Sequence, residues 1–123
     1  MLHAFIDFET RSRADLKKCG QTKYARDEST VVLCLAGKLP GGSTFLWTPG
    51  KRIPNRLRKV VVEGGELHAH NASFEKAIWK YVMVPQHGWP EVEDEQWHCT
   101  LARCAALALP RSLDQASRAL GLA

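Results

Sequence analysis

The stretch LHAFIDFE, at residues 2–9, decides the fold of this chain. It mixes apolar, aromatic and β-favouring residues in the way that a central strand of a sheet does. Successive side chains of a strand point to opposite faces, so Asp7 and Glu9 share one face of this strand. Ile6 and Phe8 share the other face. The stretch therefore predicts a buried strand that carries two carboxylates on one side.

The bulk composition predicts one domain of a cytoplasmic protein. With 123 residues, 45% of them hydrophobic, the chain is long enough for one compact core and too short for two ordinary domains. We therefore assign residues 1–123 to one domain. The sequence has no apolar run of about eighteen residues, and its start lacks the features of a signal peptide. We expect neither contact with a membrane nor export.

The four cysteines predict free thiols. A cytoplasmic setting disfavours disulfides, and the C-x-x-C spacing that favours zinc is absent from the sequence. A structural zinc site built from these cysteines and from histidines stays open as an alternative, although the spacing argues against it. The cysteines are Cys19, Cys34, Cys99 and Cys104.

The net charge is +4, and the charged residues are clustered. Lysine and arginine concentrate in residues 11–26 and 51–59, whereas acids fill residues 91–95. Clustered basic residues fit a polyanionic partner such as nucleic acid. The alternative is an ordinary solvated surface on a mildly basic protein.

The order of the remaining elements predicts an α/β fold. Segments 30–39 and 43–48 flank a Pro-Gly-Gly turn, as in a hairpin, so the first three strands would form an antiparallel meander. A further strand is expected at 66–70. Helices are expected at 54–65, 71–84, 100–109 and 112–122.

Two of these helices carry local signals. In the 71–84 helix, Phe74, Ile78 and Val82 recur at helical spacing, and Asn71 or Ser73 could cap the first turn. The 112–122 helix begins with the capping-box pattern Ser112-x-x-Gln115.

The acids suggest a site for a hard cation. Asp7 and Glu9 would repel each other unless a cation lies between them, and partial burial would add to that cost. Oxygen ligands without histidine or cysteine nearby suit Mg²⁺ or Mn²⁺. Glu75 lies in the first turn of the 71–84 helix, which the preceding strand would bring to the same edge of the sheet. The ordinary alternatives are an exposed strand end for the pair and compensation of the helix dipole for Glu75.

Taken together, two motifs of this sequence resemble a known family. FIDFET at residues 5–10 and AHNASFE at residues 69–75 resemble the first and second motifs of the DnaQ-like (DEDD) 3′→5′ exonucleases. The resemblance extends, in the same order, to LWTPG at residues 46–50 and to WHCTLARCAALALPRSLDQASRALGL at residues 97–122. Over nearly its whole length the chain is similar to the N-terminal proofreading domain of bacteriophage-type family-A DNA polymerases.

The resemblance implies a fold and an activity. The fold would be ribonuclease H-like, with the antiparallel three-strand meander and a further strand in a mixed sheet flanked by helices. The activity would be metal-dependent release of nucleoside 5′-monophosphates from the 3′ end of single-stranded DNA. A polymerase domain would normally lie in the same chain.

The resemblance also implies roles for single residues. Asp7 would bridge two divalent ions, Mg²⁺ or Mn²⁺. Glu9 would bind the first ion, and Glu75, in place of the usual aspartate, would hold the second through water. Thr10 and Asn71 would contact the substrate.

The third motif of the family, an aspartate on a late helix, has no match in this sequence. Asp114 is the only acid of the final segment, but it lies in the first turn of a capped helix and lacks the expected spacing. We therefore expect a C-terminally truncated domain with little or no activity alone.

Other candidate groups receive no role in the site. Cys99 stands where related nucleases often have an acid, and His70 and His98 are better explained by packing or capping. The alternative function is a non-catalytic module on the same scaffold, which would bind nucleic acid or protein through its basic face.

Overall fold

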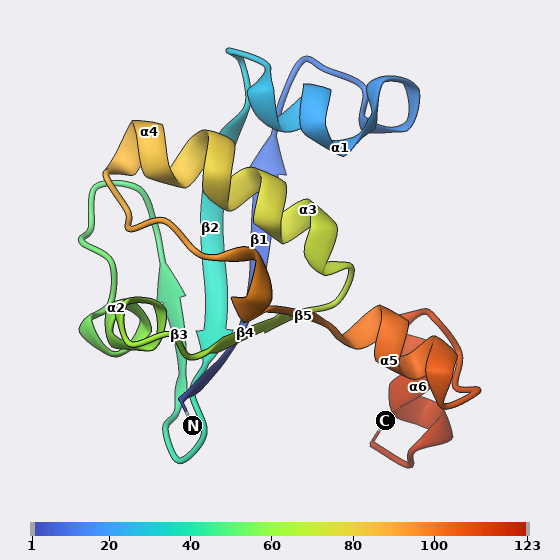
Figure 1. Cartoon of the computed structure of the whole chain (residues 1–123). Coiled ribbons are helices and arrows are strands. Elements are labelled where there is room, and N and C mark those ends of the chain that lie inside the picture. The colour runs from blue at the N-terminus through green and yellow to red at the C-terminus, as the bar shows by residue number, and fades with distance from the viewer. Residues whose placement is uncertain (1, 123) are drawn as a thin grey trace.

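The computed structural model describes residues 2–122 and shows an α/β fold built on a five-stranded mixed sheet (Figure 1). The strand order is β3-β2-β1-β4-β5. The antiparallel meander is confirmed, because β1 pairs with β2 and β2 with β3 in antiparallel register. On the other side of β1, β4 and β5 run parallel to it. The strands are β1 His3–Arg11, β2 Val31–Lys38, β3 Thr44–Trp47, β4 Glu66–Ala69 and β5 Trp97–Cys99.

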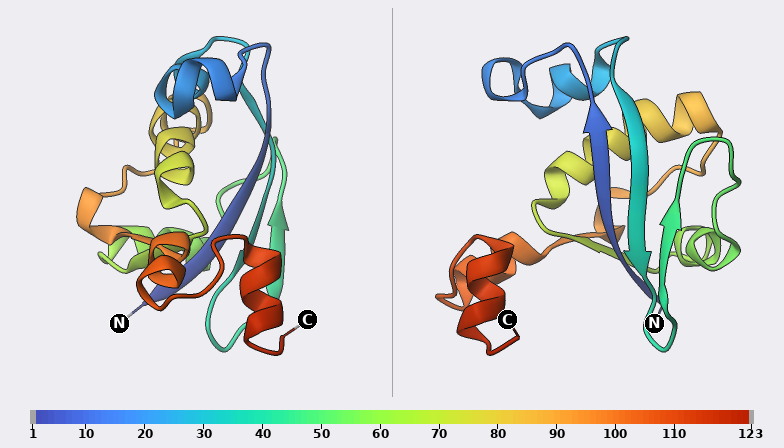
Figure 2. Two further views of the ribbon diagram at one scale, coloured as in Figure 1. Left: turned by 90° about the vertical axis from the view of Figure 1, so that its right-hand side faces the viewer. Right: turned by 180° about the vertical axis from the view of Figure 1, so that it is seen from behind.

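The helices lie mainly on one face of the sheet. Figure 2 shows the α3–α4 helix and α2 behind the strands when the molecule is seen from the back, and β1 and β2 uncovered in front. In Figure 1 the helix α1 lies beyond the end of β1. The helices are α1 Leu16–Arg26, α2 Asn55–Val62, α3 Ala72–Ile78, α4 Val84–His87, α5 Thr100–Ala106 and α6 Leu113–Ala119.

The core lies between the sheet and the α3–α4 helix. The alternation expected for β1 is confirmed, since Ile6 and Phe8 are buried and Asp7 and Glu9 are exposed. Trp79 packs edge-on against Phe8, with ring centroids 6.3 Å apart, and is fully enclosed. This face is therefore the hydrophobic one, and the two acids lie on the opposite face.

The 71–84 helix is confirmed but is not a single regular α-helix. Of its predicted core positions, Ile78 and Val82 are fully buried, whereas Phe74 is partly buried and packs against the core. A π-helical turn, Trp79–Met83, joins α3 to α4. In this turn the backbone N–H of Val84 bonds Trp79 O, five residues back, as in a π-helix. Pro85 explains the irregularity, because proline has no N–H to bond the carbonyl four residues back.

Two elements were not expected from the sequence. The basic segment 11–26 contains α1, which Asp15 caps by accepting a hydrogen bond from Lys17 N. Gly20 breaks the helical geometry inside it with a φ of 82°, so no continuous apolar stripe marks the helix. The strand β5 was also missed, because three residues are too few to show a periodic pattern.

Gln96 connects its own segment, residues 93–96, to residues 61–65, which are distant in sequence. Its buried side-chain amide donates to Val61 O at 3.1 Å and to Gly65 O at 2.9 Å, and its oxygen accepts from Glu93 N at 2.9 Å. The carbonyls lie at the end of α2 and just before β4, and Gln96 itself ends a short 3₁₀ turn, Asp94–Gln96, before β5. The amide therefore anchors the outer strand of the sheet.

We expect Gln96→Leu to lower the free energy of unfolding by about 2–3 kcal/mol, because leucine makes none of these hydrogen bonds and leaves the carbonyl of the buried Gly65 without the amide that it bonds. Urea denaturation monitored by tryptophan fluorescence measures the change. Glu95→Ala, at the exposed neighbouring position, is the matched control and should stay within about 0.5 kcal/mol of the parent. Equal effects of the two substitutions would contradict this role of Gln96.

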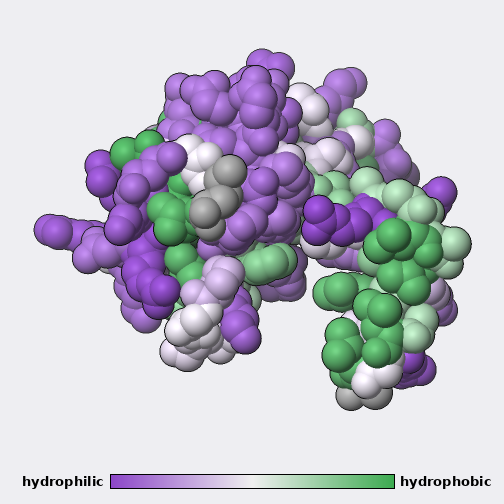
Figure 3. Space-filling view, turned by 60° about the horizontal axis from the view of Figure 1, so that its bottom comes forward, coloured by the Kyte–Doolittle hydropathy of each residue, from purple (hydrophilic) through white to green (hydrophobic). Residues whose placement is uncertain are grey.

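The segment α5–α6 leaves several leucines exposed. Ser112 caps α6 as predicted, accepting a hydrogen bond from Gln115 N at 3.4 Å. Figure 3 shows hydrophobic side chains gathered over this part of the molecule. The exposed leucines are Leu107, Leu113, Leu120 and Leu122. No helix within residues 2–122 is long and apolar enough to cross a membrane.

Candidate active site

The site begins where β1 extends beyond the end of its parallel neighbour, β4. β4 pairs with β1 only from His3 to Phe5, whereas β1 continues to Arg11. Beyond Phe5, the edge of β1 that faces β4 has no strand partner. The carboxylate of Glu75 fills part of this gap by accepting a hydrogen bond from Phe8 N at 3.0 Å.

A tight connection between β4 and α3 sets the position of Glu75. Asn71 joins the strand to the helix in the left-handed region, with φ 71° and ψ 59°, a conformation that asparagine tolerates better than most residues. The side chain of Asn71 makes no capping bond; its Oδ1 instead accepts from the Ser73 hydroxyl at 3.2 Å. The predicted side-chain cap by either residue is therefore wrong. Three residues into the helix, Glu75 faces the edge of β1.

The environment of Glu75 disfavours a negative charge. Burial is the main cause that raises the pKa of Glu75, to about 8, and the nearby carboxylates of Asp7 and Glu9 raise it further. The hydrogen bond from Phe8 N acts in the opposite direction but does not compensate. A carboxyl group in this position would release its proton readily only if a cation came close.

The three predicted acids are neighbours, but they do not form a closed ligand shell. Glu75 reaches the edge of β1 from the helix side, while Asp7 and Glu9 stand exposed on the open face. Among residues 2–122, none of the three makes an ion pair with a lysine, arginine or histidine. Their oxygens are not all within 4.8 Å of one another. The arrangement offers oxygen ligands on either side of one strand edge, and no cationic side chain within residues 2–122 pairs with Asp7 or Glu9.

The two predicted substrate contacts are Thr10, near the end of β1, and Asn71, just before α3. Thr10 follows an irregularity in the β1–β2 register after Glu9, and its hydroxyl is 2.8 Å from the hydroxyl of Tyr24 in α1. Asn71 is exposed at the start of α3. The hydroxyl of Thr10 thus has a partner within the protein, and its contribution to ordering α1 was not visible in the sequence.

Basic side chains follow the C-terminal end of β1. The chain leaves this strand at Arg11 and enters the segment that forms α1 (Figure 1). The exposed basic residues of the segment are Arg11, Arg13, Lys17, Lys18, Lys23 and Arg26. The predicted basic cluster at residues 11–26 is therefore exposed and begins two residues after Glu9.

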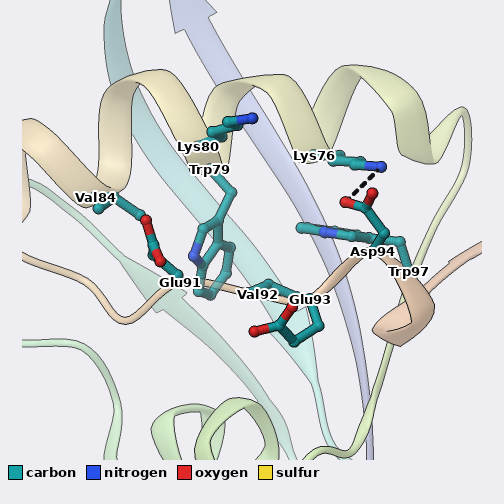
Figure 4. A pocket seen from close by; sticks show the side chains of 9 residues that line it. All are labelled: Lys76, Trp79, Lys80, Val84, Glu91, Val92, Glu93, Asp94 and Trp97. Atoms are coloured by element: carbon teal, nitrogen blue, oxygen red, sulfur yellow. Dashed lines mark ion pairs between the residues drawn. The ribbon is translucent and has the colours of Figure 1, made fainter.

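Two hollows lie outside this region. One, of about 170 Å³, is lined by residues of α3, the π-helical turn and the segment 91–97, and contains the Lys76–Asp94 ion pair at 2.9 Å (Figure 4). The other, of about 390 Å³, is lined by Lys51, Arg52 and Arg58 from the second basic cluster, together with His87 and Trp89. Neither includes an acid predicted for the site.

His70 and Asp114, which have no role in the predicted site, make contacts elsewhere in the protein. His70 joins α5 and α6 to the sheet, with Nδ1 2.8 Å from Thr100 Oγ1 and Nε2 2.5 Å from Arg111 O. Asp114 forms an ion pair with Arg118 at 3.3 Å on the exposed α6, away from the end of β1 (Figure 1). In residues 2–122 none of the four cysteines is bonded to another.

Sequence reasoning missed a second group of potential ligands. His3, Glu66 and His68 each offer one ligand atom, and these atoms lie within 4.8 Å of one another. His98 lies beside them, with Nε2 3.5 Å from Glu66 Oε1. The signal in the sequence was Glu-Leu-His at 66–68, whose first and third side chains share a face of the strand. The third residue, His3, joins them only because β1 pairs with β4, which is distant from it in sequence.

Comparison with known proteins adds no assignment. A scan against models of known families matched nothing, and a search of curated proteins found no sequence of significant similarity. The site is therefore interpreted from its own chemistry and from the motifs in the sequence.

Proposed function

We propose that this chain is a metal-dependent 3′→5′ exonuclease domain of the ribonuclease H-like, DnaQ-like type, of the kind that proofreads for bacteriophage-type family-A DNA polymerases. The observation that carries the proposal is the buried carboxylate of Glu75 at the edge of β1, close to Asp7 and Glu9 and without a cationic partner. The five-stranded mixed sheet with helices on one face is compatible with this type of fold.

The donor set fits Mg²⁺ or Mn²⁺, which prefer carboxylate oxygens and retain water in their coordination shell. Asp7, Glu9 and Glu75 would hold the ions. When bound, such a pair of ions activates a water molecule and stabilises the leaving oxygen of a phosphodiester. The basic surface of α1 would attract the phosphates of a single strand, and its position next to the acids would direct the strand to them.

The proposal predicts Mn²⁺ binding that depends on Asp7. We expect Asp7→Asn to weaken Mn²⁺ binding at least about tenfold, because Mn²⁺ is held mainly by charged oxygens. Calorimetric titration or the electron spin resonance signal of free Mn²⁺ measures the affinity. Glu63→Gln, which removes an exposed acid elsewhere, is the control and should bind as the parent does. Equal affinity of the Asp7 and Glu63 variants would contradict the proposal.

The activity assay uses 5′-labelled single-stranded DNA with Mn²⁺. Slow shortening from the 3′ end is expected, because Asp114 lies on α6, away from the trio, and does not supply the carboxylate of the third motif. The Asp7 variant should show no shortening above background. Cleavage at internal positions, or shortening that Asp7→Asn leaves unchanged, would rule out this activity for the site.

A non-catalytic binding module is the second candidate. The open arrangement of the three acids favours it, since their oxygens do not converge within 4.8 Å. This alternative predicts binding of single-stranded DNA that is independent of divalent ions. It also predicts that Asp7→Ala raises the melting temperature, because removal of an uncompensated charge relieves repulsion. The exonuclease proposal predicts that Mn²⁺ raises the melting temperature of the parent and not that of this variant.

A further inference from the structure

The neighbouring strands β1, β4 and β5 bring four potential ligands to one place. The parallel register pairs His3 with Glu66 and His68 with His98. Paired residues of neighbouring strands share a face, and Glu66 and His68 are two residues apart on β4, so all four side chains project from the same side. This is the face opposite to the buried Ala4 and Leu67, and hence opposite to the helices. The backbone pairing itself creates the cluster.

The ligand atoms lie at the spacing of a metal site. His3 Nδ1 is 3.0 Å from His68 Nε2 and 2.9 Å from Glu66 Oε2, and His68 Nε2 is 3.3 Å from the same oxygen. Ligands of a tetrahedral zinc ion, with bonds of about 2.0–2.1 Å, lie about 3.3 Å apart. The three atoms therefore form a triangle that could serve as one side of such a site.

The surroundings hold the central ligand in place. His68 is 5% exposed, and its ring stacks on that of Phe5, with centroids 4.7 Å apart, and against His98 at 5.2 Å. A buried ring nitrogen directed at another ring nitrogen and at a carboxylate is what a metal site requires of its ligands. The Phe5 ring also covers one side of the His68 ring.

We propose that His3, Glu66 and His68 bind a zinc ion, with His98 as the fourth ligand. Two or three imidazoles with one carboxylate select zinc over the Mg²⁺ or Mn²⁺ that the acids of β1 would hold. The two sites are distinct, since His3 and Asp7 are four residues apart on one strand, about 13 Å at about 3.3 Å per residue. The ion would tie the three-residue strand β5, and through it α5, to the centre of the sheet. This inference does not depend on the exonuclease proposal.

The experiment is a titration of chelator-treated protein, without an affinity tag, with Zn²⁺ in competition with a chromophoric chelator. We expect one ion per chain and a rise in melting temperature on addition of zinc. Glu66→Gln, which keeps the shape of the side chain, and His3→Ala, at a partly exposed position, should each weaken binding at least about tenfold. His87→Ala is the matched control, since His87 packs against Trp47 and is not part of the cluster.

The same variants decide the outcome without relying on the buried His68, whose replacement could unfold the protein. Absence of zinc binding would overturn the proposal and leave a hydrogen-bonded cluster. Binding that both variants retain at full strength, or that alkylation of the cysteines abolishes, would also overturn it. Binding with unchanged strength in Asp7→Asn would show that the ion does not occupy the carboxylate site.

Discussion

Glu75→Gln is expected to stabilise the metal-free protein at pH 8 by an amount on the order of 4 kcal/mol and to have little effect near pH 4. Burial, with the charges of Asp7 and Glu9, raises the pKa of Glu75 to about 8, from 4.5 for a free side chain. Glutamine keeps an oxygen that can accept the hydrogen bond from Phe8 N and carries no charge to bury.

The direction of the pH dependence follows from the proton balance. Between about pH 4.5 and pH 8 the folded protein holds a proton on Glu75 that the unfolded chain has released. The stabilising contribution of this raised pKa is fully present below about pH 4.5, declines as the pH rises, and is lost once the pH passes about 8. The Glu75→Gln variant lacks this decline, so the difference in free energy of unfolding between the variant and the parent grows with pH.

Urea denaturation in the presence of a chelator, at several pH values from 4 to 9, measures the effect. Glu63→Gln, which removes an exposed acid, is the control and should follow the parent. Parallel curves for the parent and Glu75→Gln over this range would show that the buried carboxyl does not hold its proton. Added Mn²⁺ should reduce the decline in the parent, because a bound cation stabilises the ionised carboxylate.

Trp79→Ala is expected to lower the free energy of unfolding by about 3–5 kcal/mol, enough to unfold a marginally stable domain. Trp79 is 1% exposed, and its Nε1 donates to Pro90 O at 2.7 Å. Its ring packs edge-on against Trp89 at 5.0 Å and Trp97 at 6.0 Å, as well as against Phe8 of β1. Alanine would leave a large cavity between the sheet and the α3–α4 helix.

Chemical denaturation gives the loss, and near-ultraviolet circular dichroism reports whether the aromatic cluster stays ordered. Trp79→Phe also gives up the hydrogen bond to Pro90 O but should lose less stability than Trp79→Ala, because it keeps an aromatic ring in the cavity. Tyr81→Ala is the control on the same helical stretch, since Tyr81 is only partly buried and lies beside Arg26 and Lys80. A loss at Trp79 no larger than that at Tyr81 would contradict a central role for this cluster.

Local signals in the sequence were enough for much of the sheet and for the main helix. Alternation in residues 2–9 predicted which side chains of β1 are buried, because strand geometry alone determines it. The Pro-Gly-Gly turn predicted the β2–β3 hairpin, and helical spacing predicted the buried Ile78 and Val82. The helix α1 escaped prediction because Gly20 interrupts it and few apolar residues mark it.

The electrostatic state of the candidate site depended on contacts between distant segments. Glu75 meets Phe8 N because the pairing of β4 with β1 ends at Phe5, three residues before Phe8, so that an N–H of β1 is left for a side chain to bond. The raised pKa of Glu75 follows from this burial, and no pattern of neighbouring residues in the sequence encodes it.

The sequence by itself determined the strands β1 to β4, the main helix and the identity of the acids, because these depend on the local order of residue types. Only the tertiary structure decided that Glu75 is buried against β1 and that His3 meets Glu66 and His68. Parallel strands pair across long loops, and the register of that pairing results from packing of the whole core. For this reason the carboxylate motifs were visible in the sequence, whereas the histidine cluster was not.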